Sequence, residues 1–293
     1  HSDFSYFVTF NLYDAKTVVT EYLNPTGLIT DWYSGKEIGE IWGYTANELF
    51  KSQEEVNAYL EKVDLSYIFS TWNPGDLKYE DTNGDDKVDV GARSLDDHGD
   101  LSVIGNSTPR YQWGISAGLN YKNFDFSFLI KGTAKRDYFP EGATSENYVF
   151  WGIRNWLFTA LQSEHLDYFR DQPGDKYTGL HEGDANINLD AFWPRPYLAT
   201  NQNAKNRQNS TRYLVDASYI RLQNVQLGYN LPANILGKIG LKQVRVFVSG
   251  ENLFTMTDFL KGIDPIAISG GGNRVGMTYG ADNIYSFGIN ATF

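Results

Sequence analysis

The chain has 293 residues, of which 15% are aromatic, and it contains no cysteine. Without cysteine it can form neither a disulfide framework nor a thiolate metal site. The formal net charge of −11 argues against general binding of nucleic acids, because such binding needs a positive surface toward the phosphates. The sequence also lacks any run of about 18 apolar residues, the length that a transmembrane helix requires.

The first part of the chain alternates between apolar and polar residues from its beginning. His1 is followed directly by this alternation, with neither the basic nor the apolar segment of a signal peptide, so we expect the chain to begin inside a longer protein. Period-two patterns predict strands at 4–12, 17–23 and 37–44. A helical pattern follows at 46–62, for which Thr45 is the predicted N-cap.

The stretch YQWGISAGLNY, residues 111–121, alternates without interruption, and FDFSFLI, residues 124–130, continues the pattern. Only Lys122 and Asn123 separate the two, which predicts a hairpin of long strands joined by a tight turn. Between them and the next strands lies a long insertion, 132–210, in which 146–170 has helical spacing.

The last third of the chain predicts three more strands. YIRLQNVQLGYNLP changes the phase of its alternation near Gln223 and Asn224, and one extra residue there would restore the facing as a β-bulge. Valines alternate over 244–248, a short helical turn is expected within 232–240, and YSFGINATF ends the chain at Phe293.

These strands share features that favour a membrane environment. Several reach about nine to eleven residues, carry aromatic residues near their ends and alternate apolar residues with serine, glycine, asparagine and glutamine, as strands of transmembrane barrels do. The predicted fold class is therefore all-β: a segment of a transmembrane antiparallel β-barrel with long extracellular loops containing short helices. The alternative is a soluble β-sandwich or barrel, with one buried and one hydrated face.

The segment DTNGDDKVD has the spacing of a calcium loop. Oxygen ligands would come from Asp81, Asn83 and Asp85, from the carbonyl of Lys87, and from Asp89. Asp86 replaces the glycine expected at the sixth position, and Ala92 stands where a carboxylate would close the shell. The alternative is an acidic surface turn held by local hydrogen bonds.

Catalytic patterns are absent from the sequence. The four histidines lie far apart without metal-binding spacing, and neither a nucleophile elbow nor a phosphate-binding loop occurs. We therefore expect that the chain is not an enzyme and that it requires no cofactor.

Several segments, taken in order and spacing, are similar to one protein family. The chain resembles the C-terminal part of SusC/RagA-like TonB-dependent transporters, the outer-membrane nutrient importers of Bacteroidetes. The resemblance covers nearly the whole chain, 1–293, and rests on the segments SGKEIGEIWGY (34–44), PGDLKYEDTNGDDKVDVGAR (74–93), VIGNSTPRYQWGISAGLNYKNFDFSFLIKG (103–132), FWPRPY (192–197), DASYIRLQNVQLGYNLP (216–232) and VRVFVSGENLFTMTD (244–258).

The resemblance implies a barrel of about 22 strands, of which this chain would supply about eight to ten at the C-terminal end. Its partners would be the remaining N-terminal barrel and plug, TonB through that plug, a SusD-like surface lipoprotein and the lipid of the bacterial outer membrane. The substrate would be a nutrient, most often an oligosaccharide and sometimes a peptide. Phe293 would be the signal for barrel insertion.

Aromatic residues of the long insertion are candidates for contact with the substrate or with the lipoprotein, because aromatic faces suit the C–H faces of sugars. The candidates are the aromatic residues Trp151, Trp156, Trp193 and Tyr197, together with Arg195. The alternative is that they pack the insertion onto the barrel rim. A second function also stays open, that of a soluble or surface-attached β-protein that binds glycans or peptides without transporting them. Release into buffer without detergent would favour this second function.

Overall fold

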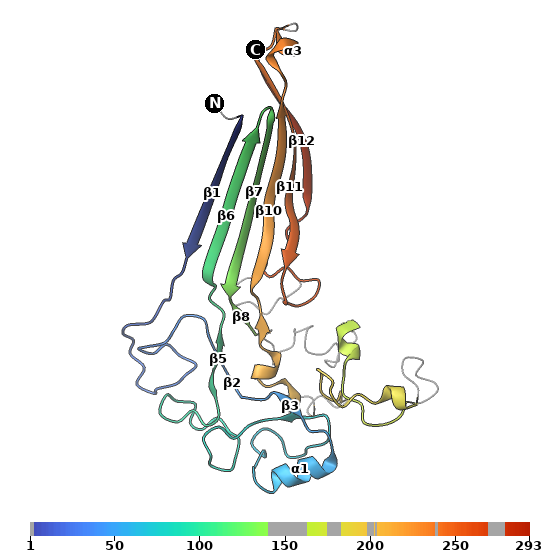
Figure 1. Ribbon diagram of the computed structural model, residues 1–293. Coiled ribbons are helices and arrows are strands. Elements are labelled where there is room, and N and C mark those ends of the chain that lie inside the picture. The colour runs from blue at the N-terminus through green and yellow to red at the C-terminus, as the bar shows by residue number, and fades with distance from the viewer. Residues whose placement is uncertain are drawn as a thin grey trace.

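The long strands assemble into one antiparallel sheet, whose order is β1-β6-β7-β10-β11-β12 (Figure 1). The computed structural model describes residues 3–139, 163–174, 183–197, 202, 204–237, 240–268 and 279–293. Its strands are β1 (Phe4–Tyr13), β6 (Arg110–Tyr121), β7 (Phe124–Lys135), β10 (Tyr219–Asn230), β11 (Gln243–Met256) and β12 (Ile284–Thr292). They run for 9 to 14 residues, which is the length that a tilted strand needs to cross a bilayer.

The number of membrane-length strands differs from the sequence expectation of about eight to ten. In the described ranges six reach that length, and the predicted strand at 17–23 is wrong, because that segment forms only an isolated bridge between Val18 and Glu37. The predicted strand at 37–44 shrinks to β2 (Glu40–Gly43), which pairs with β5 (Ser102–Asn106) outside the large sheet. Short alternating patterns thus belong to the loops here.

Connections at the two ends of the sheet differ in length. At one end, Lys122 and Asn123 join β6 to β7, with Lys122 at φ 53, and a segment containing α3 (Ala233–Leu236) joins β10 to β11. Both the tight turn and the helical turn were predicted and are confirmed. At the other end the connections are 14–109, 136–218 and 257–283. Short turns at one end and long loops at the other are typical of outer-membrane barrels, in which the long loops are extracellular.

The predicted bulge in β10 is confirmed. The register of β10 shifts between Leu222 and Asn224 against both β7 and β11. Gln223 is the extra residue against β7, whereas on β11 Asn252 and Leu253 lie opposite it. The shift returns Val225 and Leu227 to the face that Leu222 occupies. One face of the sheet therefore stays apolar across the change of phase.

Pairing across the sheet separates two chemical faces. One row of paired residues is entirely apolar, and it runs through Tyr6, Leu119, Phe126, Leu227, Val248 and Phe287. The next row is mostly small and polar, and it runs through Phe7, Gly118, Ser127, Gln226, Ser249 and Ser286. We call the first the apolar face and the second the inner face.

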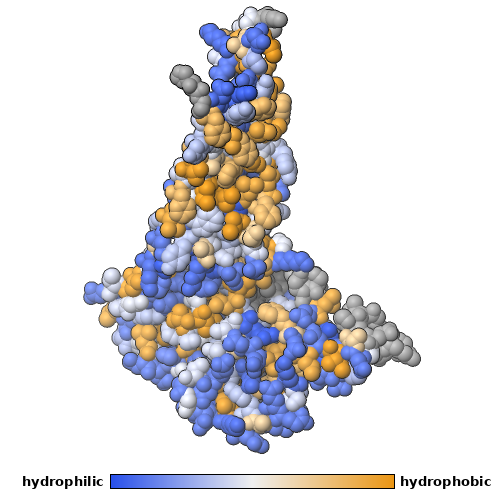
Figure 2. All heavy atoms as spheres, in the orientation of Figure 1, coloured by the Kyte–Doolittle hydropathy of each residue, from blue (hydrophilic) through white to orange (hydrophobic). Residues whose placement is uncertain are grey.

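The apolar face is exposed rather than packed against another layer of the chain. Tyr6 is 72% exposed and Phe287 is 69% exposed. Figure 2 shows hydrophobic residues gathered over the strands, whereas hydrophilic residues prevail beyond the long-loop end. This exposure of apolar side chains fits contact with lipid.

The two longer connections, 14–109 and 136–218, fold together into a unit that we call the loop layer. Its elements are β2, β5, β3 (Glu48–Leu49), β4 (Leu77–Lys78), β8 (Asp137–Tyr138), β9 (Val215–Asp216), α1 (Gln53–Leu60) and the 3-10 helices Ser163–Leu166, Asp184–Asn186, Lys205–Arg207 and Thr211–Tyr213. The predicted helix at 46–62 is confirmed only as α1, because its first residues form β3 instead. Its N-cap is Ser52, whose hydroxyl accepts the Glu55 N–H, and the prediction of Thr45 was wrong.

The hydrophobic core of the described chain lies in this loop layer. Both connections contribute to it, with the residues Tyr44, Ala46, Leu49, Phe50, Val56, Leu65, Trp72, Leu77, Tyr79, Val88, Val90, Phe139, Phe169, Ala191, Trp193 and Tyr213. None of the helices in the described ranges is both long and apolar enough to cross a membrane.

Candidate functional site

The inner face of the sheet carries balanced charges near the short-turn end. Arg245 on β11 forms an ion pair with Asp125 on β7, donating through Nε to Asp125 Oδ2 at 2.9 Å. The same guanidinium donates to Gln226 Oε1 on β10 at 2.8 Å. Three neighbouring strands are thus joined by side chains that leave this face polar without a net charge at this point.

A second arginine ties the connection 257–283 to the inner face. Arg221 on β10, only 4% exposed, donates through Nη2 to Asp264 Oδ1 at 2.6 Å and through Nε to the Thr255 hydroxyl at 2.8 Å. Burial would raise the pKa of Asp264, but hydrogen bonds from Arg221 and from the backbone N–H groups of Ala281 and Ile266 outweigh it and lower that pKa. The described part of this connection is therefore fixed against the sheet.

A buried ion pair joins the two connections of the loop layer. Lys205 Nζ lies 2.5 Å from Asp76 Oδ2, and both side chains are inaccessible to solvent. Asp76 also accepts hydrogen bonds from Asn206 Nδ2 and from the Tyr197 hydroxyl, each at 2.8 Å, while Lys205 donates to Thr71 O at 2.9 Å. Burial lowers the pKa of Lys205, and the carboxylate of Asp76 opposes this effect. Removal of one partner from such a buried pair strongly destabilises the fold, because the other charge stays buried without a counter-charge.

The predicted contact residues of the insertion lie around this ion pair. Trp193 is 7% exposed and stacks on Tyr213 at a ring distance of 5.9 Å. Arg195 forms an ion pair with Asp171, and the Tyr197 hydroxyl donates to Asp76. Burial, followed by the charge of Asp76, raises the pKa of Tyr197.

The structure brings Trp193, Arg195 and Tyr197 together within the loop layer. There they contact other residues of the loop layer, as in the packing alternative that the sequence analysis left open. Their contact with a substrate or partner stays a prediction. Trp151 and Trp156 lie outside the described residues, as does most of the helical pattern at 146–170.

The predicted calcium loop forms a tight turn held by its own side chains. Asp81 accepts the N–H groups of Gly84 and Asp86, and Asp86 adopts the left-handed conformation, φ 63, that glycine usually supplies at this position. Asn83 accepts the Asp85 N–H at 3.0 Å. The backbone therefore takes a turn suited to the predicted ligands.

A lysine ammonium lies among the predicted calcium ligands of this loop. The ammonium of Lys87 lies 2.7 Å from Asp89 and 3.4 Å from Asp85, which gives these carboxylates an internal cation. The hydrogen bond with Lys87 lowers the pKa of Asp89. Among the described residues, no group of three or more histidine, cysteine, aspartate or glutamate side chains is arranged to hold a metal. Both the calcium site and the plain acidic turn remain alternatives.

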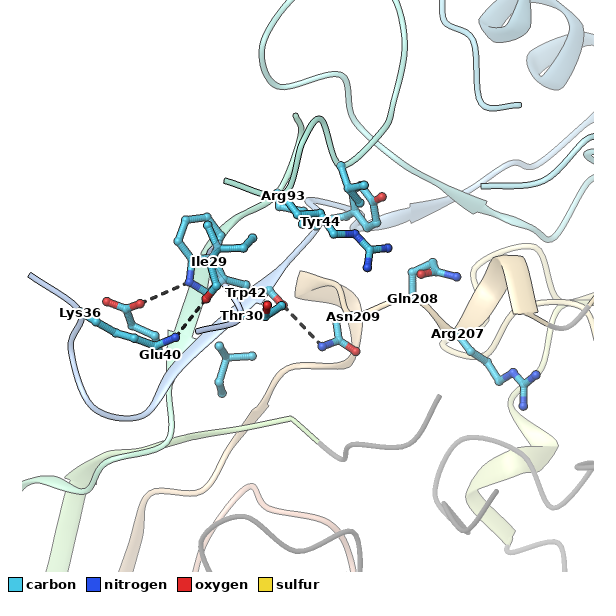
Figure 3. A pocket seen from close by; sticks show the side chains of 13 residues that line it. Ile29, Thr30, Lys36, Glu40, Trp42, Tyr44, Arg93, Arg207, Gln208 and Asn209 are labelled. Carbon is cyan, nitrogen blue, oxygen red and sulfur yellow. Dashed lines mark hydrogen bonds between the residues drawn. The ribbon is translucent and has the colours of Figure 1, made fainter. Parts of the chain in front are cut away.

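A cavity of about 450 Å³ opens in the loop layer, where three segments distant in the sequence meet (Figure 3). Its walls come from residues 29–44 and 90–101 of the first connection and from Arg207, Gln208 and Asn209 of the second. The Asn209 amide donates to Trp42 O at 3.5 Å, and the Asn209 carbonyl accepts the Tyr44 N–H at 2.8 Å. Sequence analysis missed this cavity, because no local spacing links its three segments.

The two described histidines do not form a catalytic group. His165 is buried against the ring of Trp193 at 5.1 Å, and His98 lies against the ring of Trp42 at 5.6 Å. Each packs on an aromatic ring in a different part of the loop layer.

Comparison with curated proteins finds TonB-dependent receptors. The chain is 28% identical over 268 residues to TonB-dependent receptor P3 of Formosa agariphila, covering 88% of this chain and 22% of that protein. It is 29% identical over 267 residues to receptor P26 of the same organism, covering 88% and 23%. With the TonB-dependent receptor SusC of Bacteroides thetaiotaomicron it shares 23% identity over 230 residues, covering 78% and 18%. The chain thus spans about a quarter or less of the length of these relatives.

Solved structures give the same fold. The structure of the RagAB peptide transporter superposes with a TM-score of 0.59 at 18% identity, covering all of this chain and 28% of that one. The open-open state of the RagAB importer gives a TM-score of 0.55 over 27% of its chain. No family model matches the chain. The matched relatives are receptors and transporters, which agrees with the expectation that the chain is not an enzyme. With its two-faced sheet and its long loops at one end, the chain is similar in sequence to TonB-dependent receptors, SusC among them, and similar in fold to part of the RagAB transporter.

Proposed function

We propose that the chain is the barrel and loop segment of an importer that moves a nutrient across the outer membrane with energy from TonB. One observation carries this proposal: the sheet presents an exposed apolar face and a polar inner face, and its three long connections leave from the same end. Such a sheet places lipid on one side and a hydrated path on the other. The remaining barrel, the plug and TonB are partners in this proposal.

An oligosaccharide is the proposed substrate class. The inner face offers hydroxyl and amide groups, among them Ser127, Gln226, Ser249 and Ser286, and these suit a solute rich in hydroxyls. Asp125 and Arg245 on this face neutralise each other, so at that point the face does not demand a charged solute. A peptide is the alternative substrate, since the matched solved structures are described as a peptide transporter and importer.

A SusD-like surface lipoprotein is the proposed partner of the loop layer. In support of this proposal, the connection 136–218 exposes four large apolar residues, each 37–42% exposed: Leu166, Ile187, Leu189 and Phe192. Residues of this kind at the centre of a patch favour protein contact. Phe293, exposed at the end of β12, remains the proposed signal for barrel insertion.

Uptake by whole cells tests the function. Cells that produce the full-length protein should accumulate a fluorescent oligosaccharide, and accumulation should stop in a deletion strain and after a protonophore collapses the membrane energy. A labelled peptide of similar size, tested in parallel, decides between the two substrate classes. Accumulation that is equal in the deletion strain would contradict import, and extraction of the protein into buffer without detergent would contradict its place in the membrane.

A further inference from the structure

The cavity of the loop layer contains an arginine whose charge is not balanced by the described residues. Arg93 stands at the cavity wall, and its guanidinium makes a single long hydrogen bond, from Nη2 to the Tyr67 hydroxyl at 3.4 Å. Four other arginines, Arg110, Arg195, Arg221 and Arg245, are held in ion pairs. Arg136, Arg170 and Arg212 each donate to several backbone carbonyls. Within the described ranges, Arg93 thus differs from these in keeping its charge available.

Carboxylates near Arg93 are engaged elsewhere. Asp97 accepts the Ala92 N–H at 3.0 Å, and Asp100 accepts the N–H groups of Thr82 and Asp89 at 2.7 and 2.9 Å. The acidic residue of the cavity wall, Glu40, accepts the Tyr33 hydroxyl, the Glu37 N–H at 2.8 Å and the Trp42 Nε1–H at 3.3 Å. An anion that binds Arg93 would therefore not have to displace a carboxylate, but only the long hydrogen bond to the Tyr67 hydroxyl.

The backbone of Arg93 adopts an uncommon conformation. Its φ is 56, in the left-handed region that residues other than glycine rarely adopt. Two backbone hydrogen bonds maintain this conformation, from the Arg93 N–H to Val90 O at 2.9 Å and from the Ile29 N–H to Arg93 O at 3.0 Å. Strained residues of this kind concentrate at ligand sites, where the surrounding structure fixes a side chain in place.

Figure 3 shows the guanidinium of Arg93 beside Tyr44, pointing toward the amides of Gln208 and Asn209. The other cations of the cavity do not join it. Arg207 points away from this group, and Lys36 donates to the carbonyls of Ile29 and Asp31 at 3.0 and 2.9 Å. The guanidinium thus lies near two amide side chains, whose nitrogens donate to Ala204 O at 3.1 Å and to Trp42 O at 3.5 Å. Ile29, Val90 and Leu101 contribute apolar surface to the same cavity.

We propose that this cavity binds an acidic sugar unit of the imported glycan, with Arg93 holding its carboxylate or sulfate group. The proposal rests on the oligosaccharide import proposed above and adds that the glycan is anionic. A guanidinium binds such groups through two parallel hydrogen bonds, amides suit sugar hydroxyls, and the apolar and aromatic wall suits the C–H face of the ring. The volume of about 450 Å³ lies within the range of small-ligand sites.

Calorimetry with the purified full-length transporter and its lipoprotein partner tests this proposal. The ligands are a uronate oligosaccharide, a sulfated oligosaccharide and a neutral oligosaccharide of equal length, and an acidic peptide. We expect Arg93→Gln to weaken binding of the uronate or the sulfated glycan at least about tenfold and to leave the neutral glycan within about twofold of wild type. The glycan that loses affinity identifies the anionic group.

Two further variants separate recognition from structure. Arg93→Lys should retain part of the affinity, because it keeps the charge but not the two parallel donors. Lys62→Gln is the matched control: Lys62 is exposed, belongs to the same connection and does not line the cavity, so its removal should leave all four affinities unchanged. Equal losses in Arg93→Gln and Lys62→Gln would mean a general effect of charge and would overturn the proposal.

The remaining outcomes distinguish this inference from the import function. If wild type does not bind either acidic glycan, or if Arg93→Gln weakens only the acidic peptide, the acidic-sugar site is contradicted. If cells import neutral oligosaccharides and Arg93→Gln leaves their preference unchanged, the inference fails while the import function stands. If wild-type cells import none of the four ligands, the proposed function itself fails.

Discussion

Aromatic side chains have opposite surroundings in the two regions of this chain. On the apolar face of the sheet, Tyr6 and Phe287 are largely exposed, whereas Phe50 and Tyr79 in the loop layer are fully buried. The loop layer faces water and buries its aromatic residues as a soluble domain does, while the strands face lipid and present theirs outward. The same residue type therefore reports the solvent that surrounds each region.

The largest difference between the regions should appear when one phenylalanine is truncated in each. Phe50→Ala removes a ring that packs against Tyr59 and Trp72 at ring distances of 5.5 and 6.3 Å, so it should cost about 3–5 kcal/mol of loop-layer stability. Phe287→Ala leaves no internal cavity and should cost much less. Hydrogen exchange of loop amides measures the first change, and equal effects of the two variants would contradict the contrast.

Buried and exposed ion pairs of the loop layer should also differ. Lys205→Met leaves Asp76 buried without its cation and should destabilise the loop layer by about 3–5 kcal/mol. Lys51→Met breaks the exposed pair with Asp190 and should produce no measurable change. Limited proteolysis of the loops in the folded barrel compares the two variants. Equal protection of Lys205→Met and wild type would show that the pair does not join the connections.

Neighbouring residues on one strand offer a sharper comparison. Val248→Arg places a charge on the apolar face and should cost about 2–4 kcal/mol near the membrane midplane, whereas Ser249→Arg places it on the inner face and should cost less than half as much. Unfolding of the refolded barrel in lipid vesicles measures both free energies. A larger cost for Ser249→Arg would reverse the assignment of the two faces.

The calcium loop should show the smallest effect. If Asp81, Asn83, Asp85 and Asp89 bind calcium, its addition should release heat and slow proteolysis at 81–89, and Asp81→Asn should weaken both effects. Calcium would also have to displace the ammonium of Lys87 from Asp85 and Asp89. A titration without heat or protection would assign the segment to the acidic turn alone.

Sequence patterns predicted the sheet better than the loop layer. The turn at Lys122 and Asn123 and the bulge at Gln223 follow from local alternation, because each strand must keep one face apolar. The pattern at 37–44 misled, because residues 40–43 pair with β5 across a long intervening loop. Local alternation does not specify such distant pairing.

The side-chain clusters of the loop layer could not be predicted from the sequence either, because their members lie far apart along the chain. Asp76 and Lys205 come from different connections, as do Arg93 and Asn209, and no spacing motif relates them. Trp193 and Tyr197 were recognised as important aromatic residues, but their positions beside Tyr213 and Asp76 depend on the tertiary fold.

Lipid accessibility along β11 tests the central claim most directly. Because the chain contains no cysteine, single spin labels can be placed at Val246, Phe247, Val248 and Ser249 in the full-length protein after any cysteines elsewhere in it are replaced. Collision with oxygen dissolved in lipid should be high at Val246 and Val248 and low at Phe247 and Ser249, with a water-soluble reagent showing the reverse. Equal accessibility at all four positions, or high water accessibility at Val246 and Val248, would contradict a sheet that separates lipid from an inner polar face.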